Sequence, residues 1–132
     1  METKILIVDD DVDFTELLKA SLEGTGKYKV QAENHGPRGL TVAKAFKPDL
    51  ILLDVMMPDM DGSDVAEEMR GDKDIKNIPI AFLTSIVKEE EVESHSGIIG
   101  GNRFIAKTVA VREIINSIEQ ILRKCLTDSA QS

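Results

Sequence analysis

The sequence has no tryptophan, only one cysteine and no apolar run that approaches the length of a membrane-spanning helix. Cys125 cannot form an internal disulfide, and its place on an apolar helical stripe indicates a small core residue. The amino terminus lacks the basic region, apolar stretch and cleavage site of a secretory signal. Basic residues are outnumbered, and the net charge of -8 opposes contact with a nucleic-acid backbone. We therefore expect a cytoplasmic protein that neither enters a membrane nor binds nucleic acid directly.

The composition is that of one globular domain, because 132 residues with 42% hydrophobic content can bury a single core. Short apolar runs rich in branched residues alternate with stretches of helical period, which is typical of repeated strand-helix units. The predicted strands span residues 4–8, 28–33, 50–53, 78–83 and 103–106. The first, third and fourth are almost continuously apolar, as expected of central parallel strands, whereas the second alternates like an edge strand. The pattern predicts an α/β fold with a doubly wound parallel sheet.

Helices are predicted in the intervals between these strands. The first has its apolar residues on one face and is followed by Gly24 and Gly26, the second begins at Gly36-Pro37, and Lys47-Pro48 ends it. The third spans about 63–70, and the last has an apolar stripe over 111–125. The mostly charged stretch 88–96 is expected to form the fourth helix, and 97–101 a loop. The domain is expected to occupy residues 1–126, followed by a polar tail over 127–132.

Three apolar runs end abruptly on ionisable residues. The first runs into Asp9 and Asp10, the third into Asp54, and the fifth into Lys107, while Thr84 follows the fourth. The carboxyl ends of neighbouring parallel strands open onto one crevice, which is where such folds bind ligands. These five side chains are therefore expected to meet there.

The acids in this group predict a metal site. Three converging carboxylates repel one another and raise their pKa values unless a cation neutralises them. Oxygen ligands without His or Cys favour a hard cation, and few protein ligands with open positions suit Mg²⁺ better than Ca²⁺. A phosphoryl group on such an ion could pass to a carboxylate and give an aspartyl phosphate, with Lys107 and Thr84 neutralising its oxygens.

The chain resembles the receiver domain of two-component response regulators over nearly its whole length. The resemblance is carried by residues 5–11 (ILIVDDD), by 48–62 (PDLILLDVMMPDMDG), by Thr84-Ser85 and by Lys107, in that order and at family-like spacing. It implies a flavodoxin-like fold, in which a five-stranded parallel sheet of order 2-1-3-4-5 has five helices on its two faces.

The resemblance also implies a role for each acid. Asp54 would be the phosphoacceptor, and Asp10 and Asp54 would bind Mg²⁺ directly, together with the main-chain carbonyl of Met56. Asp9 would act on the ion through water. The phosphoryl donor would be a sensor histidine kinase or a histidine phosphotransfer protein, so the chain would be a regulator that assists its own phosphorylation and dephosphorylation without turning over a substrate.

The same resemblance implies a conformational switch. Lys107 would contact the phosphoryl group, and Thr84 would move to hydrogen-bond it and draw Phe104 inward. The surface of the fourth helix, fifth strand and fifth helix would change as a result. Because no linker to an output domain is recognisable, we expect the output to be contact with a downstream protein target or relay of the phosphoryl group.

Two departures from the family pattern bear on this site. Family members usually follow the lysine with a proline in a cis peptide, whereas this chain has Thr108 there. A cis bond before a non-proline residue costs about 2.5 to 4 kcal/mol, so we predict a trans or strained bond. The glycine-rich segment 97–102 replaces the alanine-rich turn that is more usual, which predicts a mobile output face.

The sequence predicts structural roles for some acids and disfavours three other protein classes. Asp11 and Asp13 are expected to cap the first helix, and Asp59 and Asp61 to shape a turn with Gly62. A calcium loop over 9–20 fails because its required glycine and final glutamate are missing. A haloacid-dehalogenase-like phosphatase is disfavoured, because its signature would lie two residues earlier in the chain and because no cap domain is recognisable. A phosphorylation-independent interaction module is disfavoured, because such a module would not need the acid pair, Asp54, Thr84 and Lys107, all of which are present.

Overall fold

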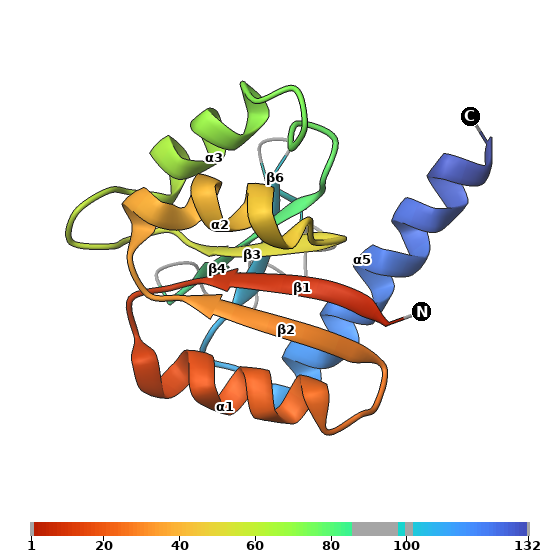
Figure 1. Ribbon diagram of the computed structural model, residues 1–132. Coiled ribbons are helices and arrows are strands. Elements are labelled where there is room, and N and C mark those ends of the chain that lie inside the picture. The colour runs from red at the N-terminus through yellow and green to blue at the C-terminus, as the bar shows by residue number, and fades with distance from the viewer. Residues whose placement is uncertain (1, 86–97, 100–101, 132) are drawn as a thin grey trace.

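The computed structural model describes residues 2–85, 98–99 and 102–131, and its sheet separates two layers of helices (Figure 1). The sheet order is β2-β1-β3-β4-β6-β5. The strands are β1 Thr3–Val8, β2 Tyr28–Glu33, β3 Leu50–Asp54, β4 Ile80–Thr84, β5 Ile98–Ile99 and β6 Asn102–Ala106. All pairs except β5 with β6 are parallel. The predicted five-stranded parallel sheet of order 2-1-3-4-5 is therefore confirmed.

The burial of the strands follows their place in the sheet. Every residue of β3 and β4 is buried, and so are the last four residues of β1. The outermost parallel strand, β2, begins with alternating buried and exposed residues, as its sequence pattern predicts for an edge. The loop predicted over 97–101 is wrong in part, because the branched residues Ile98 and Ile99 form the short antiparallel strand β5 beside β6.

The helices begin and end at residues whose local chemistry explains the boundary. Helix α1 spans Val12–Glu23, and the Asp11 side chain caps it by accepting the Phe14 N–H at 3.1 Å. The predicted second helix starts as a 3₁₀ turn over Gly36–Arg38 and continues as α2, Gly39–Phe46, which ends at Lys47 in a left-handed conformation. Helix α3 spans Gly62–Arg70.

The carboxyl-terminal helix, α5, spans Val111–Gln131. The structure thus continues as helix where a frayed polar tail after residue 126 was expected, because residues 127–132 contain no glycine or proline to stop a helix. The predicted fourth helix lies outside the described residues. Within the described part of the chain, no helix is long and apolar enough to cross a membrane.

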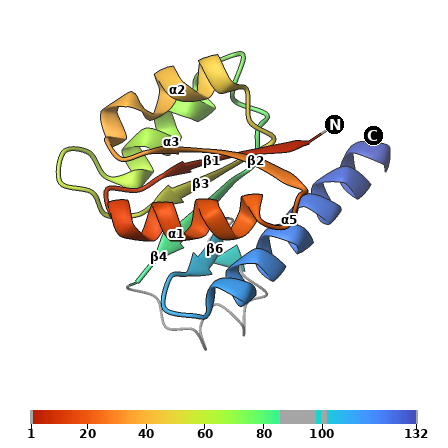
Figure 2. The same cartoon turned by 60° about the horizontal axis from the view of Figure 1, so that its bottom comes forward.

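Two hydrophobic clusters lie on the two faces of the sheet. Helices α1 and α5 cover one face, and α2 and α3 cover the other (Figure 2). Alternate residues of each strand point to opposite clusters, so Leu52 belongs to the α1 and α5 side while Leu53 belongs to the α2 and α3 side. Both are fully buried, and each contributes about 1.5 to 3 kcal/mol by leaving water. This packing fixes the strand ends that hold the site.

Candidate functional site

The carboxyl edge of the sheet brings together the side chains that follow β1, β3, β4 and β6. Strand register pairs Asp54 with Leu83 and Thr84 with Ala106, which places the ends of these strands side by side. Lys107 follows immediately, and its N–H donates to the Thr84 carbonyl at 2.9 Å.

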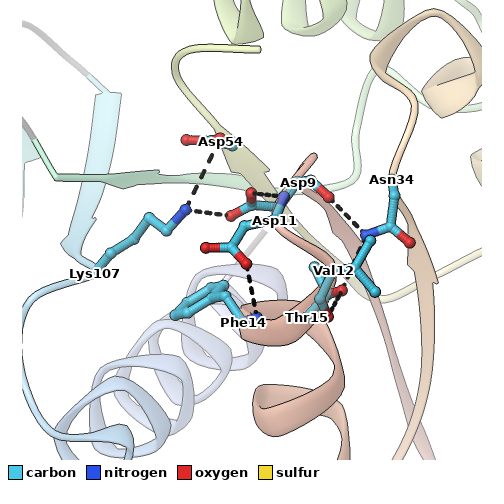
Figure 3. Close-up of polar contacts among 8 residues, drawn as sticks. All are labelled: Asp9, Asp11, Val12, Phe14, Thr15, Asn34, Asp54 and Lys107. Carbon is cyan, nitrogen blue, oxygen red and sulfur yellow. Dashed lines mark hydrogen bonds and ion pairs between the residues drawn. The ribbon is translucent and has the colours of Figure 1, made fainter. Parts of the chain in front are cut away.

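Asp9 is the most buried acid of the group and has partners on both carboxylate oxygens. Its exposed fraction is 0%. Oδ1 accepts the Asp11 N–H at 3.0 Å, and Oδ2 accepts a hydrogen bond from Lys107 Nζ at 2.7 Å (Figure 3). A buried carboxylate with these donors is held in one orientation.

Asn34 anchors the chain where it leaves β1. Its Nδ2 donates to the Asp9 carbonyl at 2.8 Å and to Thr15 Oγ1 at 3.0 Å, while Thr15 Oγ1 donates to the Val12 carbonyl at 3.0 Å (Figure 3). The Asn34 side chain thus extends the β1–β2 ladder beyond Glu33. Hydrophobic periodicity does not single out Asn34, although a polar side chain directly after an edge strand is a usable signal.

Asp54 ends β3 with an exposed fraction of only 7%. Burial, followed by the negative charge of Asp9, raises the pKa of Asp54 from 3.8 to about 7, while the positive charge of Lys107 lowers it. Lys107 Nζ lies 3.9 Å from Asp54 Oδ2, farther than from Asp9. The repulsion that was predicted among converging acids is therefore present, and Lys107 offsets only part of it.

Gly62 allows the chain to pass close to Asp54. Its N–H donates to the Val55 carbonyl at 2.8 Å, and a Cβ added at Gly62 would overlap the main-chain carbonyl oxygen of Asp54. Glycine is therefore required here by space, since its φ is not in the left-handed region. The sequence predicts a turn at Gly62 but not this close contact.

The acid group fits a divalent cation. One carboxylate oxygen from each of Asp9, Asp10 and Asp54 lies within 4.8 Å of the others, with Asp10 exposed and the other two buried. This all-oxygen donor set, open to solvent on the Asp10 side, suits a hard ion that retains water ligands. Met56 is 61% exposed. Its predicted role as a ligand involves only the main-chain carbonyl, so the side chain is free to lie in solvent.

Lys107 reaches this edge without a cis peptide bond. The described chain contains none, so the Lys107–Thr108 bond is trans, which confirms one of the two predicted alternatives. The Lys107 side chain is 14% exposed and extends between the acids and the ring of Phe14, whose centroid lies 4.6 Å from Nζ. From the sequence, Phe14 is predicted only to lie on the apolar face of the first helix.

The two predicted switch residues lie on the neighbouring strands β4 and β6, Thr84 at the end of β4 and Phe104 two residues before the end of β6. Thr84 is buried, with an exposed fraction of 2%. Phe104 is partly buried, and its ring stacks on that of Phe82, with the centroids 5.4 Å apart. The movement predicted for Thr84 and Phe104 stays a prediction.

Comparison with known proteins decides the family. A sequence profile described as the response regulator receiver domain matches residues 5–119. The chain belongs to this family. A similar protein is the alkaline phosphatase synthesis transcriptional regulatory protein PhoP of Bacillus subtilis (strain 168), with 38% identity over 94% of this chain and 50% of PhoP. Receiver domains are signalling regulators.

Solved structures agree with the assignment. A CheY-like response regulator receiver domain protein from Methanospirillum hungatei JF-1 has a TM-score of 0.79 at 27% identity, covering 97% of this chain and 99% of that one. The signal receiver domain of a signal transduction histidine kinase from Syntrophus aciditrophicus has a TM-score of 0.74 at 31% identity, covering 92% and 91%. This receiver domain spans about half the length of the curated relatives it matches.

Proposed function

We propose that this receiver domain accepts a phosphoryl group on Asp54 from the phosphohistidine of a sensor histidine kinase or a histidine phosphotransfer protein. The observation that carries the proposal is the placement of Asp54: a nearly buried carboxylate that ends a central strand, beside two further acids and one lysine. Such a carboxylate is costly to bury, and the positive charge of Lys107 offsets only part of that cost.

The proposed step transfers the phosphoryl group between two protein side chains. A deprotonated Asp54 oxygen attacks phosphorus, the bond from phosphorus to the donor's imidazole nitrogen breaks, and that nitrogen keeps the electron pair. Because the pKa of Asp54 is about 7 without a cation, a cation at the site favours the reactive form. Loss of the group by hydrolysis returns Asp54 to a carboxylate.

Asp10 and Asp54 would hold Mg²⁺ directly, together with the Met56 carbonyl, and Asp9 would act on the ion through water. When bound, the ion supplies positive charge to the carboxylates and to the transferred phosphoryl oxygens. Lys107 supplies a second positive charge, since its ammonium already lies 2.7 Å from Asp9 Oδ2.

The output would come from the surface next to the site. Thr84 and Phe104 lie on neighbouring strands, and their registers bring Phe82 and Phe104 into contact. A hydroxyl that moves toward the phosphoryl group would free space for Phe104 and change the surface formed by β6 and α5. We propose that a downstream protein target reads this change, or that a histidine phosphotransfer protein takes the group onward.

Intact-mass measurement after incubation with acetyl phosphate tests the proposal. We expect the protein to gain one phosphoryl group only when Mg²⁺ is present, and Asp54→Asn to gain none. Asp59→Asn is the matched control, since Asp59 is exposed and pairs with His35 outside the acid group. A folded wild-type protein that gains no group under any condition, or an Asp54→Asn variant that still gains one, would contradict the proposal.

A further inference from the structure

The Lys107 ammonium has an aromatic neighbour as well as acidic ones. Its Nζ lies 4.6 Å from the centroid of the Phe14 ring, which is within the distance at which a cation is attracted by the negative face of an aromatic ring. In Figure 3 the ring lies below the ammonium while Asp54 lies above it. The lysine side chain is only 14% exposed, so little water competes for this contact.

The Phe14 ring is itself held in place. Its residue occupies the first turn of α1, where its N–H donates to the Asp11 cap at 3.1 Å. The ring packs against the hydrophobic cluster under α1 and α5. Phe14 therefore offers Lys107 a fixed surface, whereas the lysine side chain alone has four flexible methylene groups.

The other contacts of Lys107 depend on the state of the site. Its bonds to Asp9 at 2.7 Å and to Asp54 at 3.9 Å are ionic, so a cation or a phosphoryl group that engages these carboxylates weakens both. The contact with Phe14 involves no charge on the ring and competes with neither ligand. It is the contact that can persist when the ionic partners change.

We propose that Phe14 is a positioning residue that keeps the Lys107 ammonium directed toward Asp54 through a cation–π contact. The inference rests on the proposed function, in which Lys107 neutralises the phosphoryl group. It assigns to the ring a task that its hydrophobic packing does not require, because an aliphatic side chain of similar size would fill the same space without attracting the ammonium.

Initial rates of phosphorylation by acetyl phosphate with Mg²⁺ provide the first test. Phe14→Leu is expected to react about three- to tenfold more slowly, and Phe14→Tyr, which keeps the ring, within about twofold of the wild type. Phe46→Leu is the matched control, because Phe46 is a partly buried ring in contact with Lys4, at 5.5 Å, and lies outside the site. Its rate is expected to equal that of the wild type.

A double-mutant cycle separates the cation–π contact from packing. In a Lys107→Met background, adding Phe14→Leu is expected to leave the residual rate unchanged, since the cation that the ring attracts is gone. If Phe14→Leu slows both backgrounds by the same factor, the ring acts through packing and the proposal is overturned.

Proton NMR gives a readout that does not depend on activity. A ring over the ammonium shifts the Lys107 ε-methylene protons upfield, and this shift is expected in the wild type and Phe14→Tyr but not in Phe14→Leu. It should persist when Mg²⁺ and beryllofluoride, a phosphoryl mimic, are added. Loss of the upfield shift on adding them would overturn the inference even if every variant were folded and active.

The two proposals fail in distinguishable ways. A wild-type protein that accepts no phosphoryl group removes the proposed function, and this inference with it. A wild-type protein that is phosphorylated on Asp54, with Phe14→Leu reacting at the same rate, removes only the role of Phe14.

Discussion

The middle of the sheet and its carboxyl edge contribute to stability with opposite signs, although adjacent residues of β3 belong to the two regions. Leu52 and Leu53 in β3 are fully buried among apolar neighbours, and the next residue, Asp54, is almost as buried but faces another acid. Packing in the middle lowers the free energy of the folded chain, whereas the carboxylates at the edge raise it. The apolar core therefore provides the stability that offsets the destabilising acid group.

A cavity in the middle of the sheet should produce the largest loss of stability. Leu52→Ala removes a fully buried side chain and is expected to lower the free energy of unfolding by about 2 to 5 kcal/mol. Urea denaturation followed by circular dichroism measures it, since the chain has no tryptophan. Leu17→Ala, at a residue 54% exposed, is the control and should change little. Equal effects at the two positions would contradict the assigned core.

The next largest loss of stability is expected from a methyl group added at the carboxyl edge of the sheet. In Gly62→Ala the added methyl group meets the Asp54 carbonyl, and the expected cost is about 1 to 3 kcal/mol, as for overpacking in general. Because the backbone of Asp54 must shift, the affinity for Mg²⁺ should fall as well. Gly71→Ala, where a Cβ meets nothing closer than ordinary van der Waals distance, is the matched control. Calorimetric titration with Mg²⁺ on both variants checks the prediction.

Removing the charge of Asp54 should raise the free energy of unfolding, whereas removing a buried side chain from the core lowers it. The pKa of Asp54 is about 7 in the folded chain and 3.8 in the reference state, so the folded chain retains a proton that the unfolded chain has lost between these values. The protonated Asp54 therefore adds its full contribution to the free energy of unfolding below about pH 4. This contribution is lost as the pH rises toward 7. Without Mg²⁺, Asp54→Asn is therefore expected to have a higher free energy of unfolding than the wild type at pH 8.

The pH dependence supplies the decisive control for that prediction. The advantage of Asp54→Asn should shrink as the pH falls from 8 to 5.5, and Mg²⁺ should stabilise the wild type but not the variant. Thermal unfolding at several pH values, with and without Mg²⁺, measures both trends. A constant difference across this range would show that charge on Asp54 is not its cause.

The smallest effect on stability is expected at Asn34, whose side chain holds the Asp9 main chain by a hydrogen bond. Asn34→Ala removes hydrogen bonds to Asp9 and Thr15 and should cost about 1 to 2 kcal/mol. Asn102→Ala, which removes an exposed hydrogen bond to Arg70, is the control and should cost less. If Asn34→Ala also weakens Mg²⁺ binding while Asn102→Ala does not, Asn34 supports the site and not only the fold.

The acids and Lys107 could be predicted from the sequence because each follows an apolar run, and strand ends of a parallel sheet meet at one edge. The contacts of Asn34, Phe14 and Gly62 could not be predicted in this way. They depend on the direction of one side chain or on the close passage of two backbones, and hydrophobic periodicity contains neither. The polar composition after residue 126 predicts a tail, but polarity alone does not stop a helix, and α5 extends to Gln131.

The ion pair between Lys107 and Asp9 joins residues 98 positions apart, at the first and last parallel strands in chain order. Contacts of such large sequence separation close the longest loops, so this one is expected to form late in folding. Weakening it should then speed unfolding more than it slows folding. The receiver site would thus be among the last parts of the chain to assemble, and a chain halted before β6 would have its acids without their lysine.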